Sequence, residues 1–223
     1  MNKKLLFYLA TILFCLSGQL FSQTYQLTGN PVNTTGWTVV PTAAVNGDFV
    51  VLTEDLTSKS GAINLNDPIN LKYCDKWRIE FDFRLDGNGT SSGRGDGFSF
   101  WYLQNPPVTS QLGSGLGIPQ NAIGLMIGFD LYNNTTGGQM NKVHLAYGVV
   151  QNTTDNNNIE YFNTAGSSFH SPDLTSTIPL VGATFKHVEV TGEVDPAIPA
   201  NWIVTLKIDG NTVINQSFAP AGG

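Results

Sequence analysis

Three segments of the sequence combine residue types that could recognise a small polar ligand. Gly95-Asp96-Gly97 places a carboxylate between two glycines, just before an apolar run. A glycine-rich segment follows at 113–118, and Asp130, Tyr132 and Asn134 alternate where the next apolar run becomes a polar loop. A carboxylate accepts hydrogen bonds from two adjacent hydroxyls, an amide both donates and accepts, and glycines let backbone N–H groups approach a ligand. With an aromatic ring to cover C–H groups, the set suits a ligand that has clustered hydroxyls and one apolar face.

Each segment also has an ordinary explanation when it is taken alone. Asp96 between glycines could be a simple turn, segment 113–117 a flexible loop, and segment 133–136 a polar linker. His144, which closes the polar loop, lies on a strand pattern, where a histidine is more often packed or solvated than a ligand. Arg94-Gly95-Asp96 spells a cell-attachment tripeptide, but three residues recur by chance. The functional hypothesis therefore depends on the order of the whole set.

Alternating apolar and polar residues predict β-strands to position these segments. The clearest is 77–85, where apolar residues alternate with charged ones, which indicates a strand with one buried and one wet face. Segment 98–103 is apolar at nearly every position, as expected of an inner strand between two layers. Further strands are expected at 49–52, 61–65, 122–132, 143–150, 185–194, 202–208 and 212–218, with a hairpin turn at 209–211. No window has a convincing helical period, so we predict an all-β, two-layer antiparallel β-sandwich whose loops carry function.

Composition and charge narrow the class of protein further. The chain has 223 residues, of which 41% are hydrophobic and only 13% charged. This is enough apolar content for a core, and too little charge for coiled coils or disorder. The formal net charge is −6, and it becomes −8 without Lys3 and Lys4. Nucleic acid is therefore not an expected partner.

The first 22 residues have the pattern of a signal peptide. Lys3 and Lys4 precede the apolar run 5–16, which is too short to span a bilayer comfortably, and we expect cleavage after Ser22. Its pattern is bacterial in character and predicts secretion or display at the cell surface. Removal of Cys15 leaves only Cys74, which we expect to be buried as a small hydrophobic side chain rather than to act as a nucleophile. No membrane span is expected in residues 23–223.

In their order and intervals, these motifs resemble those of the L-type (legume-type) lectins, which have the concanavalin A-like jelly-roll fold. Asp96 matches the Asp of the family's ADG motif, and Gly113, Ser114 and Gly115 match the start of its GG-x-LG loop. Asp130, Tyr132, Asn134 and His144 match the family's metal loop, and the resemblance covers roughly Tyr25 to Phe218. It implies carbohydrate binding by Asp96, Gly113, Ser114, Gly115, Tyr132 and Asn134. It also implies a cis peptide at Gly95–Asp96, held in the family by calcium.

The metal loop departs from the family pattern at two positions. Gly128 stands where the family has a Glu, and 137–139 (Gly-Gly-Gln) stand where it has a second Asp. We therefore predict that the family's manganese site is absent or very weak, and that His144 is a remnant or structural. A single calcium is expected on Asp130, the Tyr132 carbonyl and Asn134. Its shell could be completed by Asp155, or by a neutral oxygen of Gln139 or Asn141.

Two other functions remain open from the sequence. Glu80 and Asp82 share a strand face at the spacing of glycosidase acids, but Arg78 and Arg84 share that face too, which favours mutual ion pairing. The loss of metal ligands favours a structural or adhesion domain that binds no sugar. We expect a non-enzymatic lectin with a carbohydrate or glycoconjugate partner. We also expect that the sequence is a fragment lacking the last strands, because it stops at Gly223, whereas the family has another strand pair after the region 213–218.

Overall fold

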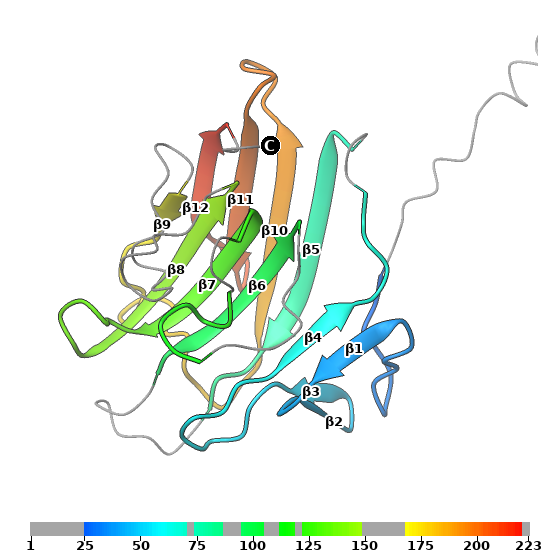
Figure 1. Ribbon diagram of the computed structural model, residues 1–223. Coiled ribbons are helices and arrows are strands. Elements are labelled where there is room, and N and C mark those ends of the chain that lie inside the picture. The colour runs from blue at the N-terminus through cyan, green and yellow to red at the C-terminus, as the bar shows by residue number, and fades with distance from the viewer. Residues whose placement is uncertain are drawn as a thin grey trace, which may run out of the picture.

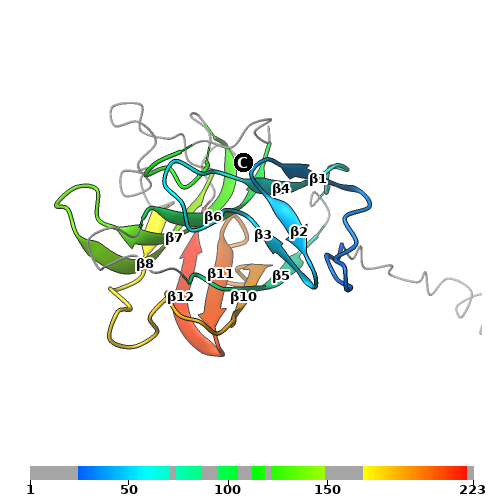
Figure 2. The same cartoon turned by 90° about the horizontal axis from the view of Figure 1, so that it is seen from below.

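Two four-stranded antiparallel sheets form the two layers of the molecule (Figures 1 and 2). The computed structural model describes residues 25–70, 74–86, 95–104, 112–118, 122–148 and 168–219. The first sheet has the order β12 (Asn211–Phe218), β11 (Trp202–Ile208), β10 (Lys186–Val194) and β5 (Lys76–Phe83). The second has the order β6 (Gly97–Leu103), β7 (Gly124–Tyr132), β8 (Gln139–Tyr147) and β9 (Ser168–His170). The predicted all-β sandwich is confirmed.

Two small sheets lie to one side of these layers (Figure 2). One pairs β1 (Trp37–Val40) with β4 (Ala62–Leu65), and the other pairs β2 (Ala44–Asn46) with β3 (Phe49–Val51). Gly61, at the entry to β4, is in close contact with the chain around it, since a Cβ there would lie 2.0 Å from the Leu52 carbonyl oxygen. In the described residues, no helix is long and apolar enough to cross a membrane.

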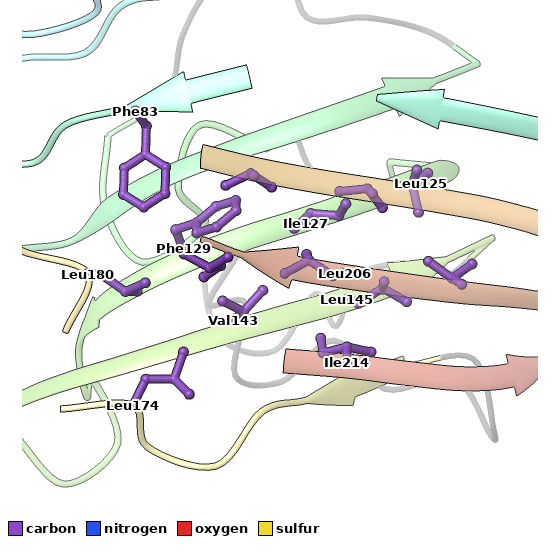
Figure 3. Packing of buried hydrophobic residues seen from close by; sticks show 14 of the residues in the cluster. Phe83, Leu125, Ile127, Phe129, Val143, Leu145, Leu174, Leu180, Leu206 and Ile214 are labelled. Atoms are coloured by element: carbon purple, nitrogen blue, oxygen red, sulfur yellow. The ribbon is translucent and has the colours of Figure 1, made fainter. Parts of the chain in front are cut away.

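The main core fills the space between the two large sheets (Figure 3). Its centre is formed by aliphatic side chains of β7, β8, β10 and β11, many of them wholly buried. Phe129 is also wholly buried and stacks on Phe98 with ring centroids 4.5 Å apart, while Phe81 and Phe83 of the facing sheet contact both rings. This aromatic cluster packs the start of β6 and the end of β7 against the facing sheet.

A second apolar cluster covers the other face of β6. It contains Leu103, Leu116, Ile118, Ala122, Met126 and Ala146, with Trp101 packed against them. Because a loop covers this face, β6 is apolar on both sides although it is an edge strand of its sheet. The expectation of an inner strand was therefore wrong. The loop of residues 112–118 covers this face of β6 in place of a further layer. It is attached to β6 by buried side chains and by a hydrogen bond from Ser99.

Most expected strands agree with the structure to within a few residues, and the exceptions are short or at strand ends. Strands β1, β2 and β9 were not predicted, and β8 begins four residues before the expected start at 143. Leu85 lies beyond β5 and forms an isolated bridge with Val181. Asp209 and Gly210 have φ angles of 49° and 78°, as the expected tight hairpin turn requires.

Cys74 is exposed rather than buried, because it precedes β5 instead of belonging to it.

Charged side chains cover the outer face of the first sheet. Arg78 bridges Glu80 on its own strand and Glu189 on β10, and Glu189 also binds Lys207 of β11. His187 lies opposite Asp82, with its Nδ1 2.8 Å from the Asp82 carboxylate and its Nε2 3.5 Å from Glu80. The hydrogen bond to Asp82 raises the pKa of His187 above its usual value of 6.5. This network explains why β5 alternates so regularly between apolar and charged residues.

The raised pKa of His187 predicts a pH dependence of stability. The folded state holds the His187 proton more tightly than the unfolded state does, so the stabilisation is complete below pH 6.5 and is lost as the pH rises through the folded pKa. Because the pair is exposed, the effect should stay below about 1 kcal/mol. Urea unfolding of wild type and His187→Gln, from about one pH unit below to two units above the usual histidine pKa, measures it. The variant should lose this pH dependence, and an identical slope in both proteins would contradict the assignment.

Candidate functional site

Asp96 lies at the very start of β6, where that strand meets the end of β7. The next residue, Gly97, pairs with Asp130, and the Asp96 carbonyl accepts a 2.8 Å hydrogen bond from the Leu131 amide. The Gly95–Asp96 peptide is cis, as the resemblance implied. Gly95 lies against Tyr132, since a Cβ on Gly95 would be 3.2 Å from that of Tyr132. Asp96 is therefore attached directly to the metal-loop segment, although it lies about thirty residues earlier in the chain.

Asp130 forms the buried base of the loop between β7 and β8. It is 1% exposed, and its Oδ1 accepts a 3.1 Å hydrogen bond from the Tyr132 amide. Its Oδ2 lies 3.3 Å from His144 Nε2 on β8. The exposed Asn134 amide donates to the Tyr132 carbonyl at 3.2 Å. The three oxygen-bearing groups expected to hold calcium thus come from one short stretch of chain.

Asn133, which the sequence analysis did not single out, sets the shape of this loop. Its side-chain oxygen accepts hydrogen bonds from the amides of Thr135 and Thr136 at 3.0 and 2.9 Å. Its own amide and carbonyl bond to Gly138 and Gly137, both of which have positive φ. An asparagine that organises its own turn in this way is a known signal, and the Asn-Asn-Thr-Thr-Gly-Gly run contained it. The turn keeps Asn134 beside Tyr132.

The glycine-rich loop is fixed to the outer face of the second sheet. Leu116 and Ile118 are buried in the second apolar cluster, and the Ser99 hydroxyl of β6 donates a 2.7 Å hydrogen bond to the Leu116 carbonyl. Gly113 is exposed, Ser114 is half-buried and Gly115 is buried. Gly113 and Ser114 are therefore the members of the predicted set that this loop offers to a ligand.

His144 lies in a row of residues that crosses the second sheet. It pairs with Gly128 on one side and with His170 of β9 on the other, and the two imidazole rings are 5.9 Å apart. His170 lies on β9, a strand that the sequence did not predict. The described part of the chain contains no group of three or more His, Cys, Asp or Glu side chains placed to hold a metal ion. Transition metals prefer such a set.

The three residues that could complete a calcium shell, Asn141, Gln139 and Asp155, differ in whether the structure leaves their oxygens near the loop. Asn141 is buried, and its oxygen accepts a 2.8 Å hydrogen bond from the Leu180 amide while its nitrogen donates to Thr175. It therefore anchors the segment 171–181 instead of facing the loop. Gln139 pairs with Tyr132 across the hairpin. Asp155 lies outside the described residues.

The two acids weighed for glycoside hydrolysis lie on the opposite sheet. Glu80 is paired with Arg78, and both Glu80 and Asp82 contact His187. These side chains sit on an outer face in an extended ion-pair network, as the alternation with arginine predicted. An arginine contact and an exposed face do not fit a general acid that needs an apolar environment.

The candidate site thus lies at the end of the second sheet where the beginning of β6 pairs with the end of β7. A model of the legume-like lectin family matches residues 17–169, a span that includes Asp96, the glycine-rich loop and the segment from Asp130 to His144. The chain therefore belongs to the legume-like lectin family, a family of carbohydrate-binding proteins, and the predicted resemblance is confirmed.

Similar proteins agree with this assignment. VIP36-like protein is 31% identical over 98 residues in mouse and 30% identical over 98 residues in human. That match takes in 44% of this chain and 26% of the relative's length. The crystal structure of the VIP36 exoplasmic/lumenal domain, solved with Ca²⁺ and Man3GlcNAc, has the same fold with a TM-score of 0.58. It is 15% identical in sequence, and the alignment covers 86% of this chain and 80% of that one.

Proposed function

We propose that the chain binds carbohydrate at the end of the second sheet where β6 begins and β7 ends. The observation that carries this proposal is the 2.8 Å hydrogen bond between the Asp96 carbonyl and the Leu131 amide. It ties the carboxylate-bearing residue to the loop of Asp130, Tyr132 and Asn134, so residues from two distant segments serve one ligand. This convergence favours a lectin site over a domain whose loops have lost their function.

Each residue of the site has a distinct chemical role. The Asp96 carboxylate accepts hydrogen bonds from two adjacent sugar hydroxyls, and Asn134 donates and accepts further ones. Gly113 and Ser114 present backbone N–H groups to the sugar. Because Gly113 has no side chain, the sugar can approach its N–H group closely. The ring of Tyr132 supplies an apolar face for sugar C–H groups. We propose that this site binds sugar hydroxyls without cleaving a glycosidic bond, which the family assignment favours.

Calcium is the metal that the donor set fits. Asp130, the Tyr132 carbonyl and the Asn134 amide are all oxygen donors, and calcium takes six to eight oxygens from carboxylates, carbonyls, amides and waters. The Asn134 nitrogen lies 3.2 Å from the Tyr132 carbonyl, and a half-turn of that amide exchanges its nitrogen for its oxygen. Water and Asp155 are the further donors that we propose. When bound, calcium would hold the loop, and with it Asp96, in the form that binds sugar.

The first ligands to test are mannose-containing oligosaccharides. The related VIP36 domain was solved with Man3GlcNAc and Ca²⁺, and the VIP36-like proteins are relatives of this chain in sequence. We further propose that the protein acts outside the cell or on its surface, as the signal-peptide pattern of residues 1–22 predicts. Its partners are then glycans or glycoconjugates in that environment.

A glycan array screened with calcium and again with a chelator tests the proposal. We expect binding to mannose-containing glycans in calcium, and a loss of affinity of about tenfold or more in chelator, because the loop then loses a ligand-linked stabilisation. Binding that survives chelation would show that the loops hold Asp96 without metal. A folded protein that binds no glycan in either buffer would contradict the proposal and favour a structural or adhesion role.

A further inference from the structure

We infer that Ser99 is a positioning residue of the carbohydrate site, an inference that rests on the proposed function. Ser99 acts through the glycine-rich loop and not by contact with the sugar. Its hydroxyl donates a part-buried 2.7 Å hydrogen bond to the Leu116 carbonyl. It lies on β6 three residues after Asp96, which directly precedes that strand, so the anchor of the glycine-rich loop is close in sequence to the carboxylate. The hydroxyl thereby sets where Gly113 and Ser114 lie relative to Asp96.

The backbone of Leu116 explains why the loop needs this anchor. Leu116 has a φ of 54°, in the left-handed region that a branched, bulky residue rarely adopts. Gly117 follows with a φ of 83°, and the Ile118 amide closes the turn on the Gly115 carbonyl at 2.9 Å. A residue keeps such a conformation only when its surroundings hold it there. For Leu116, the surroundings are the buried side chain and the Ser99 hydroxyl.

The restraint on Leu116 also limits the position of Gly113, at the end of the loop that we propose contacts the sugar. The Leu116 amide donates to the Gly113 carbonyl at 2.9 Å, so Gly113 is tied to the same turn. Across the sheet, Ser99 pairs with Gly128, which has no side chain to hold the hydroxyl. Loss of the hydroxyl therefore removes one of the two restraints on the turn and leaves the buried Leu116 side chain as the other. Preorganised backbone donors bind more tightly than mobile ones, because less conformational freedom is lost on binding.

Three variants separate this role from a general contribution to stability. Ser99→Ala removes the hydroxyl, Ser99→Thr keeps one, and Thr205→Ala removes a hydroxyl that bonds to Asn215 on the exposed face of the other sheet. For each protein, affinity is measured by calorimetry with the best glycan from the array, well below the melting temperature. Amide hydrogen exchange of residues 113–118 is followed in parallel.

We expect Ser99→Ala to weaken glycan affinity about fivefold, the scale of one part-buried hydrogen bond, with faster exchange confined to the loop. Ser99→Thr should restore both properties, and Thr205→Ala should change neither. Wild-type affinity in Ser99→Ala would overturn the inference while leaving the proposed function intact, as would weaker binding with unchanged exchange in the loop. A wild-type protein that binds no glycan would instead refute the proposed function, and this inference with it.

Discussion

Asp96→Ala is expected to abolish glycan binding while the domain remains folded. The carboxylate lies at the start of β6, partly exposed, and only its backbone takes part in the contact with Leu131. Removing the side chain therefore leaves the fold intact but deprives two sugar hydroxyls of a charged acceptor. Charge-assisted hydrogen bonds contribute about 1.5–3 kcal/mol each, so the loss should be roughly a hundredfold or more.

Calorimetry against the array-selected glycan, together with a thermal melt, measures this effect. Asp82→Ala is the matched control, because Asp82 is an exposed carboxylate on the outer face of the other sheet, paired with His187. It should leave affinity unchanged. If Asp96→Ala still bound glycan with wild-type affinity, the site would have to lie elsewhere on the molecule.

Gly97→Ala is expected to lower the free energy of unfolding by about 3 kcal/mol, a large effect for one added methyl group. Gly97 has a φ of 139°, and a Cβ at this position would lie 2.0 Å from the Phe129 carbonyl oxygen. That oxygen is backbone within β7, next to the aromatic cluster, so it cannot move aside cheaply. The strands must separate where Gly97 pairs with Asp130, which also displaces Asp96.

Chemical denaturation gives the stability change, and glycan titration of the folded fraction gives the effect on the site. Gly182→Ala is the control: a Cβ there meets nothing within 4 Å, and its amide can still donate to the Leu85 carbonyl. It should stay within about 0.5 kcal/mol of wild type. Equal stability of the Gly97 and Gly182 variants would show that β6 and β7 are not in the close contact described.

The strands of the two large sheets could be predicted because their burial alternates. In β5, each charged residue faces solvent and each apolar one faces the core, and this period is visible in the sequence. Strand β2 was missed because it is short and exposed at all three positions, and β1 has only four residues, too few to show a clear period. The edge position of β6 was also hidden. Its second apolar face is covered by the loop with Leu116, and composition does not reveal which segment will cover a face.

The candidate site could be proposed from the sequence as an ordered set of residues, but most of the hydrogen bonds that support it could not. Asp96, the glycine-rich loop and Asp130 to Asn134 were recognised by type and spacing. Ser99 acts through one hydrogen bond to a backbone carbonyl, and a serine in a strand gives no distinctive pattern, whereas the turn of Asn133 had a signal in the sequence that was not used. Asn141 shows the reverse case, because an amide that looked available to a metal is used to hold a distant segment. Hydrogen bonds between residues far apart in the sequence can be identified only once the fold is known.

A crystal structure of residues 23–223 with calcium and the best-binding glycan tests the central claim most directly. We expect a sugar whose adjacent hydroxyls bond to the Asp96 carboxylate, with Gly113, Ser114 and Asn134 around it. We also expect calcium on Asp130, the Tyr132 carbonyl and Asn134. A glycan bound away from Asp96, for example on the charged face around Arg78 and Glu189, would contradict it.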